Sequence, residues 1–220
     1  MTSSRTYGAI IFDLDGLMLD TETLARSMWR KSGDELGYPI NDELYNRLVG
    51  RTQADCDAIL LEQLGSGFPF QSMREHIAFH WARHIEQHPV PRKPGLLELL
   101  HFIDASGIGK AVATSSRKLN ALQKLGELAL RFDIIVTGDD VARGKPAPDI
   151  FLFAAGQLQQ SPAQCLVLED SWPGVQAART AGMDVIMVPD LAPPHDQATH
   201  VCASLHEVLA FLKNRPVTPS

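Results

Sequence analysis

The stretch that decides the fold is Ala9-Ile10-Ile11-Phe12-Asp13-Leu14-Asp15-Gly16, near the start of the chain. Its first four residues form a continuous apolar run, which predicts a strand covered on both faces, as in a parallel sheet. The run leads directly into two aspartates and a glycine. Ligands of doubly wound α/β sheets bind beyond the carboxyl ends of the strands, so Asp13 and Asp15 stand where a binding site is expected.

Further strands and helices alternate along the rest of the chain. Apolar runs that predict strands are Ala111–Ala113, Ile134–Val136, Leu166–Leu168 and Val185–Val188. Helical spacing of apolar residues occurs at Leu96–Ile103, at Leu119–Leu125 after a Ser115-Ser116 cap, at Pro173–Gly182 and at Leu205–Leu212. This order predicts right-handed βαβ units and an α/β fold with a doubly wound, mainly parallel sheet.

One long segment interrupts the alternation. Between about Leu17 and Arg92 the sequence shows only amphipathic helical patterns, such as Met73, Ile77, Trp81 and Ile85 at every fourth residue. Connections between strands usually take only a handful of residues. We therefore expect a helical domain over residues 17–92, inserted after the first strand, and an α/β core made of residues 1–16 and 93–220.

Composition and charge exclude several classes of function. The 220 residues are 45% hydrophobic and 21% charged, with a formal net charge of -6, which argues against a protein that coats nucleic acid. No stretch approaches the roughly 20 apolar residues that span a membrane, and no signal peptide is recognisable. The three cysteines have no metal-type spacing. We expect a cytoplasmic monomer or weak homodimer with no nucleic-acid or membrane partner.

Polar groups that suit a phosphate or a hard cation follow each predicted central strand. These are Asp13 and Asp15 after the first, Thr114, Ser115 and Ser116 after the second, Lys145 beyond the third, and Glu169 and Asp170 after the fourth. Each group alone is a weak indication. Because the carboxyl ends of parallel strands meet at one edge of a sheet, we expect all of them in one site.

This combination of groups is suited to the hydrolysis of a phosphate ester. Asp13 is the candidate nucleophile, through an aspartyl-phosphate, and Asp15 is the candidate general acid and base. Asp13 and Asp170 are candidate Mg²⁺ ligands, with Glu169 holding metal-bound water, and Lys145 offsets negative charge. The Thr114 hydroxyl and the N–H groups of Ser115 and Ser116 are candidates to bind the phosphoryl oxygens. The sequence thus favours a Mg²⁺-dependent phosphatase acting on a small phosphate ester.

These residues resemble the signature of the haloacid dehalogenase superfamily. Asp13–Glu22 resembles its first motif, Ala113–Ser116 the second, Gly144–Asp149 the third, and Leu168–Ser171 with Gly174 the fourth. The resemblance covers Ala9 to about Pro189, with all motifs in order. It implies that the core is Rossmann-like, that Asp15 also offers its backbone carbonyl to Mg²⁺, and that the insertion is a mobile helical cap.

Within the superfamily, the residues that make up the motifs are most similar to those of the branch that contains β-phosphoglucomutases and sugar or nucleotide phosphatases. Two departures separate this chain from the mutases: Ala25 stands where they carry a histidine, and Gln53 aligns with their phosphate-binding arginine. Both absences favour hydrolysis over mutase chemistry. Arg51, in the Gly50-Arg51-Thr52 loop, is then the candidate residue for substrate specificity, with an ordinary solvated loop residue as the alternative.

Alternatives remain at this point. A phosphosugar mutase is the closest alternative. A dehalogenase has no use for Asp15 or a metal, and a phosphoacceptor module of response-regulator type is much shorter. Hexose phosphates, polyol phosphates and nucleoside monophosphates all stay open as substrates.

The row His76, His80, His84 and His88 has the i, i+4 spacing that can chelate zinc, but a half-exposed helix face accounts for it more simply.

Overall fold

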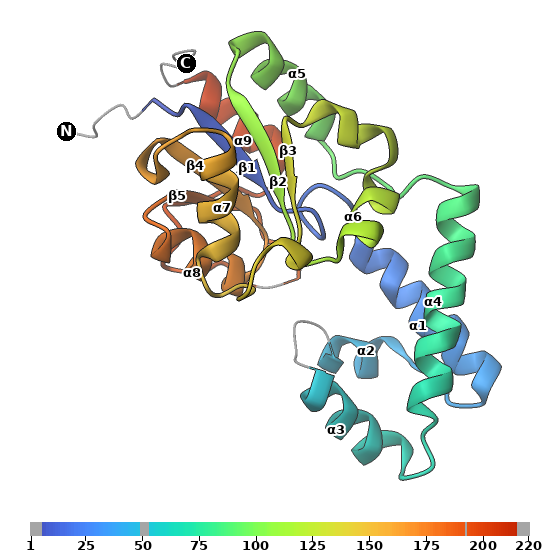
Figure 1. The fold of residues 1–220 in the computed structure, drawn as a ribbon. Coiled ribbons are helices and arrows are strands. Elements are labelled where there is room, and N and C mark those ends of the chain that lie inside the picture. Colours follow the sequence, from blue (N-terminus) through green and yellow to red (C-terminus); the bar gives the residue numbers. More distant parts are fainter. Residues whose placement is uncertain (1–5, 49–52, 192, 215–220) are drawn as a thin grey trace. The chain divides into compact units, whose positions relative to one another are not determined.

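A computed structural model describes residues 6–48, 53–191 and 193–214, with the backbone alone for residues 53 and 54. The chain divides into two compact units. Unit 1 comprises Met1–Asp20 and Pro91–Ser220, and unit 2 comprises Thr21–Val90 (Figure 1). Arg51 and its loop neighbours Gly50 and Thr52, and the side chain of Gln53, lie outside the described residues.

Unit 1 is built on a parallel sheet whose strand order is β3-β2-β1-β4-β5-β6. The strands are β1 (Ala9–Phe12), β2 (Gly109–Ala113), β3 (Ile134–Val136), β4 (Cys165–Glu169), β5 (Asp184–Met187) and β6 (His200–Val201). In the register, Phe12 stands beside Val112 of β2 and Leu168 of β4, so the ends of three central strands are level. Asp13 therefore leaves the sheet at its centre.

Helices cover both faces of this sheet. They are α5 (Leu96–Ser106), α6 (Lys118–Leu125), α7 (Asp149–Gln157), α8 (Trp172–Thr180) and α9 (Leu205–Lys213), with short 3-10 turns at Gly126–Arg131, Gly138–Asp140 and Pro162–Gln164. Helices α7 and α8 lie on one face, and α5 and α9 on the other (Figure 1). All four residues of β1 are completely buried, as a strand covered on both sides requires. The predicted doubly wound α/β fold is confirmed.

Two local predictions were wrong or incomplete. Helix α6 begins after Arg117, not after a serine cap, and Leu119 and Leu122 of the predicted apolar face are 69% and 40% exposed. Of the predicted apolar face only Leu125 is buried, together with Ala121, because only this narrow side of the helix packs inward. Strand β6 was not predicted, since two residues are too short for an apolar run to be recognised.

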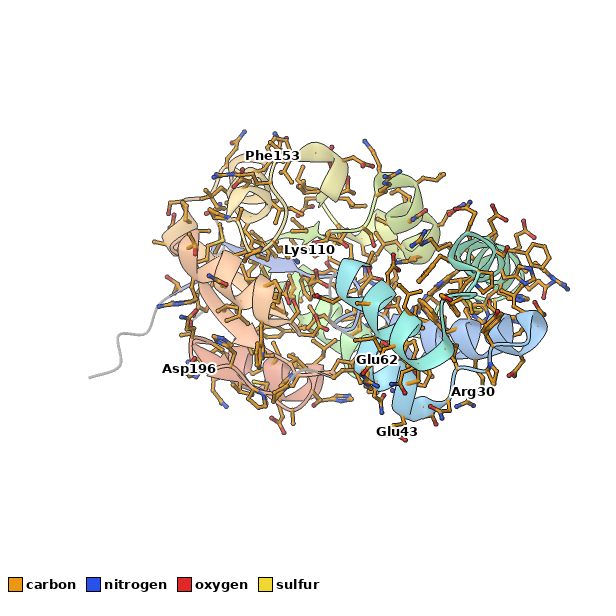
Figure 2. The ribbon with its side chains drawn as sticks, turned by 90° about the horizontal axis from the view of Figure 1, so that it is seen from below. Arg30, Glu43, Glu62, Lys110, Phe153 and Asp196 are labelled. Carbon is orange, nitrogen blue, oxygen red and sulfur yellow. The ribbon has the colours of Figure 1, made fainter. Side chains whose placement is uncertain are left out.

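All regular secondary structure in the described part of unit 2 is helical. Its helices are α1 (Thr21–Leu36), α2 (Asp42–Leu48), α3 (Gln53–Leu64) and α4 (Phe70–Gln87). They share a small core of their own, to which Tyr45, Leu60 and Met73 contribute completely or almost completely buried side chains. Charged residues such as Arg30, Glu43 and Glu62 point outward from these helices (Figure 2). This division of apolar and charged faces gives unit 2 a hydrophobic core separate from that of unit 1.

The chain leaves unit 1 and returns to it at one place. The backbone N–H of Asp20 donates to the Pro91 carbonyl at 2.8 Å, and the N–H of Lys93 donates to the Met18 carbonyl at 2.9 Å. The Lys93 ammonium also pairs with Asp190 at 2.6 Å. These bonds anchor both connections in unit 1.

None of the described helices has the combination of length and apolar character that crossing a membrane requires.

Candidate active site

Strand β1 delivers Asp13 to the carboxyl edge of the sheet. The Asp13 N–H donates to the Leu168 carbonyl at 3.0 Å, which extends the pairing with β4 by one residue and fixes the direction of the side chain. Asp13 as a whole is only 7% exposed. A carboxylate in such a position requires a cationic or hydrogen-bonding partner, because burial of an isolated charge is costly.

Lys145 is that partner. Its ammonium contacts Asp13 Oδ1, donates to Glu169 Oε1 at 2.7 Å and donates to the Ala113 carbonyl at 3.1 Å. The ammonium also lies 4.9 Å from the centre of the Phe151 ring, a favourable cation–π distance. Burial opposes the charge on Lys145, but the carboxylates of Asp13 and Glu169 outweigh it and raise the pKa of Lys145 above its usual range.

Three carboxylates gather around this single ammonium. Ligand oxygens of Asp13, Glu169 and Asp170 all lie within 4.8 Å of one another. Burial raises the pKa of Asp13 and of Asp170, and the neighbouring carboxylates raise both further. One lysine does not balance three negative charges. A divalent cation with oxygen ligands would relieve this repulsion, so the residues present fit a metal of the Mg²⁺ class.

Two glycines make room for these carboxylates. Gly16 has a φ of +85°, and a Cβ there would meet Asp170 Oδ2 at 2.2 Å. A Cβ on Gly174 would meet Glu169 Oε1 at 1.7 Å. Ser171 holds the other Glu169 oxygen, through its N–H at 2.8 Å and its hydroxyl at 2.9 Å. Glu169 is thus engaged at both oxygens, which suits the supporting role predicted for it.

The hydroxyl residues after β2 form the opposite side of the site. Thr114 is buried, and its Oγ1 accepts a hydrogen bond from the Ser116 N–H at 3.1 Å. The Thr114 hydroxyl proton is left free to turn toward a ligand, because that bond uses only the oxygen as acceptor. The Ser116 N–H, predicted to contact phosphate directly, is used inside the protein in this structure.

Asp15 lies two residues after Asp13 in the sequence but has different neighbours in space. Its Oδ1 accepts from the Lys124 ammonium at 2.7 Å, and its Oδ2 accepts from the Ser116 hydroxyl at 2.7 Å. Lys124 also donates to that hydroxyl at 3.1 Å, so the three side chains form a closed triangle. Lys124 comes from helix α6, and this triangle makes it a functional candidate that the sequence interpretation missed.

The candidate residues share one cavity of about 450 Å³ in unit 1. Its lining consists of Asp13, Asp15, Thr114, Ser115, Ser116, Lys145, Asp170, Ser171 and Pro173. A wider hollow of about 590 Å³, between Gln176, Arg179 and Thr199, lacks the carboxylate cluster and the buried lysine. Chemistry, not volume, therefore identifies the smaller cavity as the candidate active site.

The sequence interpretation also singled out three positions of unit 2, namely Ala25, Arg51 and Gln53. Arg51, the candidate for substrate specificity, lies outside the described residues. Ala25 is half-buried on α1 and packs against the core of unit 2, and a methyl side chain there offers no proton-transfer group. The feature that separates the chain from the mutases in sequence is therefore an ordinary packing residue in the structure.

Comparisons with known proteins agree with this site. The sequence pattern of the family described as haloacid dehalogenase-like hydrolase matches residues 10–188. The chain is 34% identical over 180 residues to a phosphorylated carbohydrates phosphatase of Thermotoga maritima, covering 81% of this chain and 83% of that protein. It is 32% identical over 188 residues to a β-phosphoglucomutase of Bacillus subtilis, covering 82% of each.

A solved structure shows the same fold. A HAD family hydrolase from Deinococcus radiodurans R1, with bound phosphate and sodium, aligns with a TM-score of 0.82 at 27% identity, covering 97% of this chain and 99% of that one. The family match spans all four sequence motifs, from β1 to the end of β5. The expected family and enzyme class are confirmed: the chain belongs to the haloacid dehalogenase-like hydrolases.

Proposed function

We propose that this protein is a Mg²⁺-dependent phosphatase that hydrolyses a small phosphate monoester through a phosphorylated Asp13. The observation that carries the proposal is the buried Asp13 carboxylate at the end of β1, in contact with the Lys145 ammonium and surrounded by groups that bind phosphate or a hard cation. The relatives that act on phosphorylated carbohydrates support the same chemistry.

In the first step, an oxygen of Asp13 attacks phosphorus and the ester P–O bond breaks. Lys145 and the Thr114 hydroxyl stabilise negative charge on the phosphoryl oxygens, since both line the cavity beside Asp13. The alkoxide that leaves takes a proton from Asp15. The products of this step are the free alcohol and an aspartyl-phosphate on Asp13.

In the second step, water attacks the phosphorus of the aspartyl-phosphate. Asp15, now ionised, removes a proton from that water, and the bond between Asp13 and phosphorus breaks. Inorganic phosphate leaves and both carboxyl groups return to their starting protonation. Asp15 lines the same cavity as Asp13, so one pocket contains the groups for both steps.

Asp13 and Asp170 would hold the metal, together with the backbone carbonyl of Asp15, and Glu169 would support it. A bound Mg²⁺ would neutralise charge between the attacking carboxylate and the anionic ester. The raised pKa values of Asp13 and Asp170 support this assignment, because burial and then the neighbouring carboxylates disfavour their ionised forms, which a bound cation would favour. Asp15 places its side chain toward Lys124, which fits a metal contact through its backbone only.

A phosphosugar mutase is the second candidate, and the 32% identity with a β-phosphoglucomutase supports it. Ala25 favours the phosphatase, because a mutase of this kind uses a histidine at that position. The two activities differ in their product. A phosphatase releases inorganic phosphate, whereas a mutase returns an isomeric phosphosugar and requires a bisphosphate activator.

The experiment is a panel of hexose phosphates, polyol phosphates and nucleoside monophosphates, each assayed for phosphate release and for isomerisation. We expect phosphate release with Mg²⁺, none after EDTA treatment, and recovery when Mg²⁺ is restored. Isomerisation without phosphate release would replace the phosphatase by the mutase. Activity that is unchanged by EDTA would contradict the metal assignment, and a stable phospho-Asp13 without turnover would contradict enzymatic hydrolysis.

A further inference from the structure

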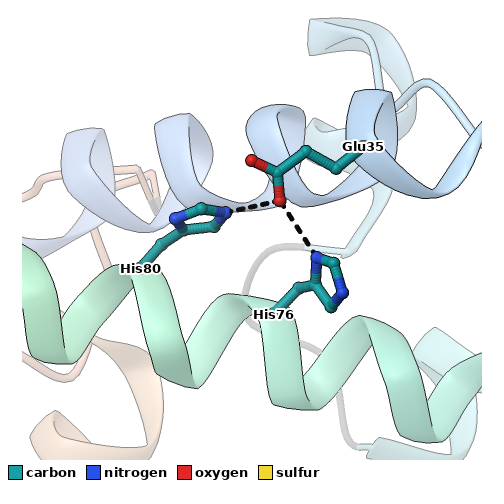
Figure 3. Close-up of side chains that lie close together, drawn as sticks. All are labelled: Glu35, His76 and His80. Carbon is teal, nitrogen blue, oxygen red and sulfur yellow. Dashed lines mark hydrogen bonds and ion pairs between the residues drawn. The ribbon is translucent and has the colours of Figure 1, made fainter.

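A second cluster of metal-ligating side chains lies in unit 2 and shares no residue with the site proposed above. Glu35 is in the last turn of α1, and His76 and His80 stand one turn apart on α4 (Figure 3). Glu35 Oε2 is 3.0 Å from His76 Nδ1 and 2.9 Å from His80 Nε2. We propose that Glu35, His76 and His80 form a binding site for a zinc-class divalent metal ion that joins α1 to α4.

The donor set fits such an ion. Two imidazole nitrogens and one carboxylate oxygen suit Zn²⁺ and its transition-metal neighbours rather than Mg²⁺, which prefers oxygen ligands. All three ligand atoms lie within 4.8 Å of one another. Around a tetrahedral zinc with bonds of about 2.0–2.1 Å, neighbouring ligand atoms are about 3.3 Å apart. The two separations from Glu35 to the histidines are a few tenths of an ångström shorter, which a small side-chain rotation corrects.

The hydrogen bonding of the cluster also points to a cation. Both rings are directed at the same carboxylate oxygen, and the other Glu35 oxygen points away from them (Figure 3). One cation in place of the two ring protons would contact all three groups at once. The hydrogen bonds from His80 and His76 lower the pKa of Glu35, so the carboxylate is available in its ionised form. Lys31, nearby on α1, is exposed and its repulsion is screened by solvent.

The three proposed ligands differ in how deeply their side chains are buried. The His80 side chain is 5% exposed and therefore fixed, whereas His76 and Glu35 are 38% and 40% exposed. One rigid ligand and two adjustable ones can close around an ion that enters from solvent, with water as the fourth ligand. The remaining histidines of the row, His84 and His88, are not part of this cluster.

The consequence concerns the stability of unit 2. Helix α1 is the first element of this unit and α4 is the last, so a metal that bridges them joins the two ends of the unit. A ligand that binds the folded state alone raises the unfolding temperature in proportion to the logarithm of its concentration above Kd. The site is therefore expected to make the stability of unit 2 depend on zinc.

The test is a zinc titration of the full chain against a chromophoric chelator in excess Mg²⁺, which keeps hard-cation sites filled. We expect one equivalent of zinc to bind in the micromolar range and to raise Tm. Glu35→Gln and His76→Gln, both at partly exposed positions, should each weaken binding by about tenfold or more. The matched controls are Glu75→Gln, beside His76 on α4, and the double variant His84→Gln/His88→Gln, which should bind zinc like the wild type.

Three results would overturn the proposal. One is zinc affinity that is unchanged in a Glu35→Gln/His76→Gln double variant whose thermal unfolding in EDTA shows that it is folded. Another is loss of binding in His84→Gln/His88→Gln instead, which would move the metal to another part of the row. A third is the absence of micromolar binding by the wild type. None of these results depends on phosphatase activity, so the proposed function stands or falls separately.

Discussion

The acidic pocket of unit 1 and the Glu35 cluster of unit 2 both collect titratable groups, but their surroundings differ. In unit 1, Glu169 is completely buried, and burial raises the pKa of Asp13 and Asp170. In unit 2, the Glu35 side chain is 40% exposed, and hydrogen bonds to two imidazoles lower its pKa. In unit 1 the neighbouring carboxylates repel one another, and a bound cation would reduce that repulsion. In unit 2 the Glu35 carboxylate already has hydrogen-bond partners when no ion is bound.

This difference separates a site built for chemistry from a site built for binding. A repulsive, buried cluster lowers the stability of the empty protein, and proteins retain such clusters where activity requires them. A satisfied, half-exposed cluster costs the protein little and adds stability when its ligand arrives. Substitutions in the two clusters should therefore affect different quantities: activity in unit 1 and metal-dependent stability in unit 2.

The largest expected effect is on catalysis in unit 1. Asp13→Asn keeps the size of the side chain but removes the nucleophile, so we expect kcat for phosphate release to fall by about 10³-fold or more. Thermal unfolding should show that the variant is folded. Asp196→Asn, whose side chain is 94% exposed on the surface of unit 1 (Figure 2), is the control and should keep full activity. An Asp13→Asn variant with near-wild-type kcat would remove Asp13 from the mechanism.

Packing around the acidic pocket should be the next most sensitive property. Gly174→Ala places a Cβ 1.7 Å from Glu169 Oε1, and Glu169 is fixed by Lys145 and Ser171. We expect the free energy of unfolding to fall by about 1–3 kcal/mol in chemical denaturation. Gly156→Ala is the control in helix α7, where a Cβ meets open space, and it should stabilise the protein by about 0.5–1 kcal/mol. Equal stabilities for the two variants would show that Glu169 is free to move.

The sequence predicted the frame of the site because each part of it is local. The apolar run before Asp13 indicates a buried strand, and the positions of Thr114 and Asp170 follow from where strands end. Lys145 lies in the loop beyond the third strand. Parallel strands with level ends then bring these residues into one cavity, as the structure shows. Alternation and strand ends require no knowledge of distant contacts, which is why this part of the fold could be inferred.

Pairings between distant side chains could not be inferred in the same way. Lys124 reaches Asp15 from a helix more than a hundred residues later, and neither residue carries a mark of this pairing in the sequence. The histidine row could be recognised in the sequence. That Glu35 contacts only two of its four histidines, His76 and His80, could not be recognised there. Such pairs depend on how helices pack and on the lengths of their side chains. The exposed Leu119 of α6 shows the converse, an apolar residue with helical spacing that packing does not use.

Lys124 provides a test of intermediate size. The hydrogen bonds from Lys124 and Ser116 orient Asp15, the proposed general acid and base. General acid–base catalysis typically raises the rate by about 10²–10⁴-fold. Lys124→Met should lose part of this, lowering kcat by about tenfold with little change in KM. Lys124→Arg should recover some of the loss, and Lys213→Met, at an exposed position on α9, should have no effect. A change confined to KM would assign Lys124 to substrate binding instead.

The smallest effect is a difference in sign between the two clusters in EDTA-treated protein. Burial raises the pKa of Asp170 to about 9 in the folded protein, whereas the usual pKa of an aspartate is about 3.9. Between these values the unfolded chain loses the proton and the folded protein keeps it, so stability falls as the pH rises. Asn is neutral at every pH. Asp170→Asn should therefore stabilise the metal-free protein by about 1 kcal/mol, or about 2–4 °C in Tm, near neutral pH and by less at acidic pH.

Glu35→Gln should do the opposite. Its pKa is lowered in the folded protein, so the ionised carboxylate contributes stability above about 4.3, the usual pKa of a glutamate, and that contribution disappears as pH falls. Glu35→Gln should lower Tm slightly near neutral pH and match the wild type in acid. Thermal unfolding at several pH values in EDTA measures both curves. Opposite pKa shifts produce opposite slopes of stability against pH. Two variants that shift Tm in the same direction across this range would therefore show that the acidic pocket and the Glu35 cluster do not differ in the way their burial and hydrogen bonding indicate.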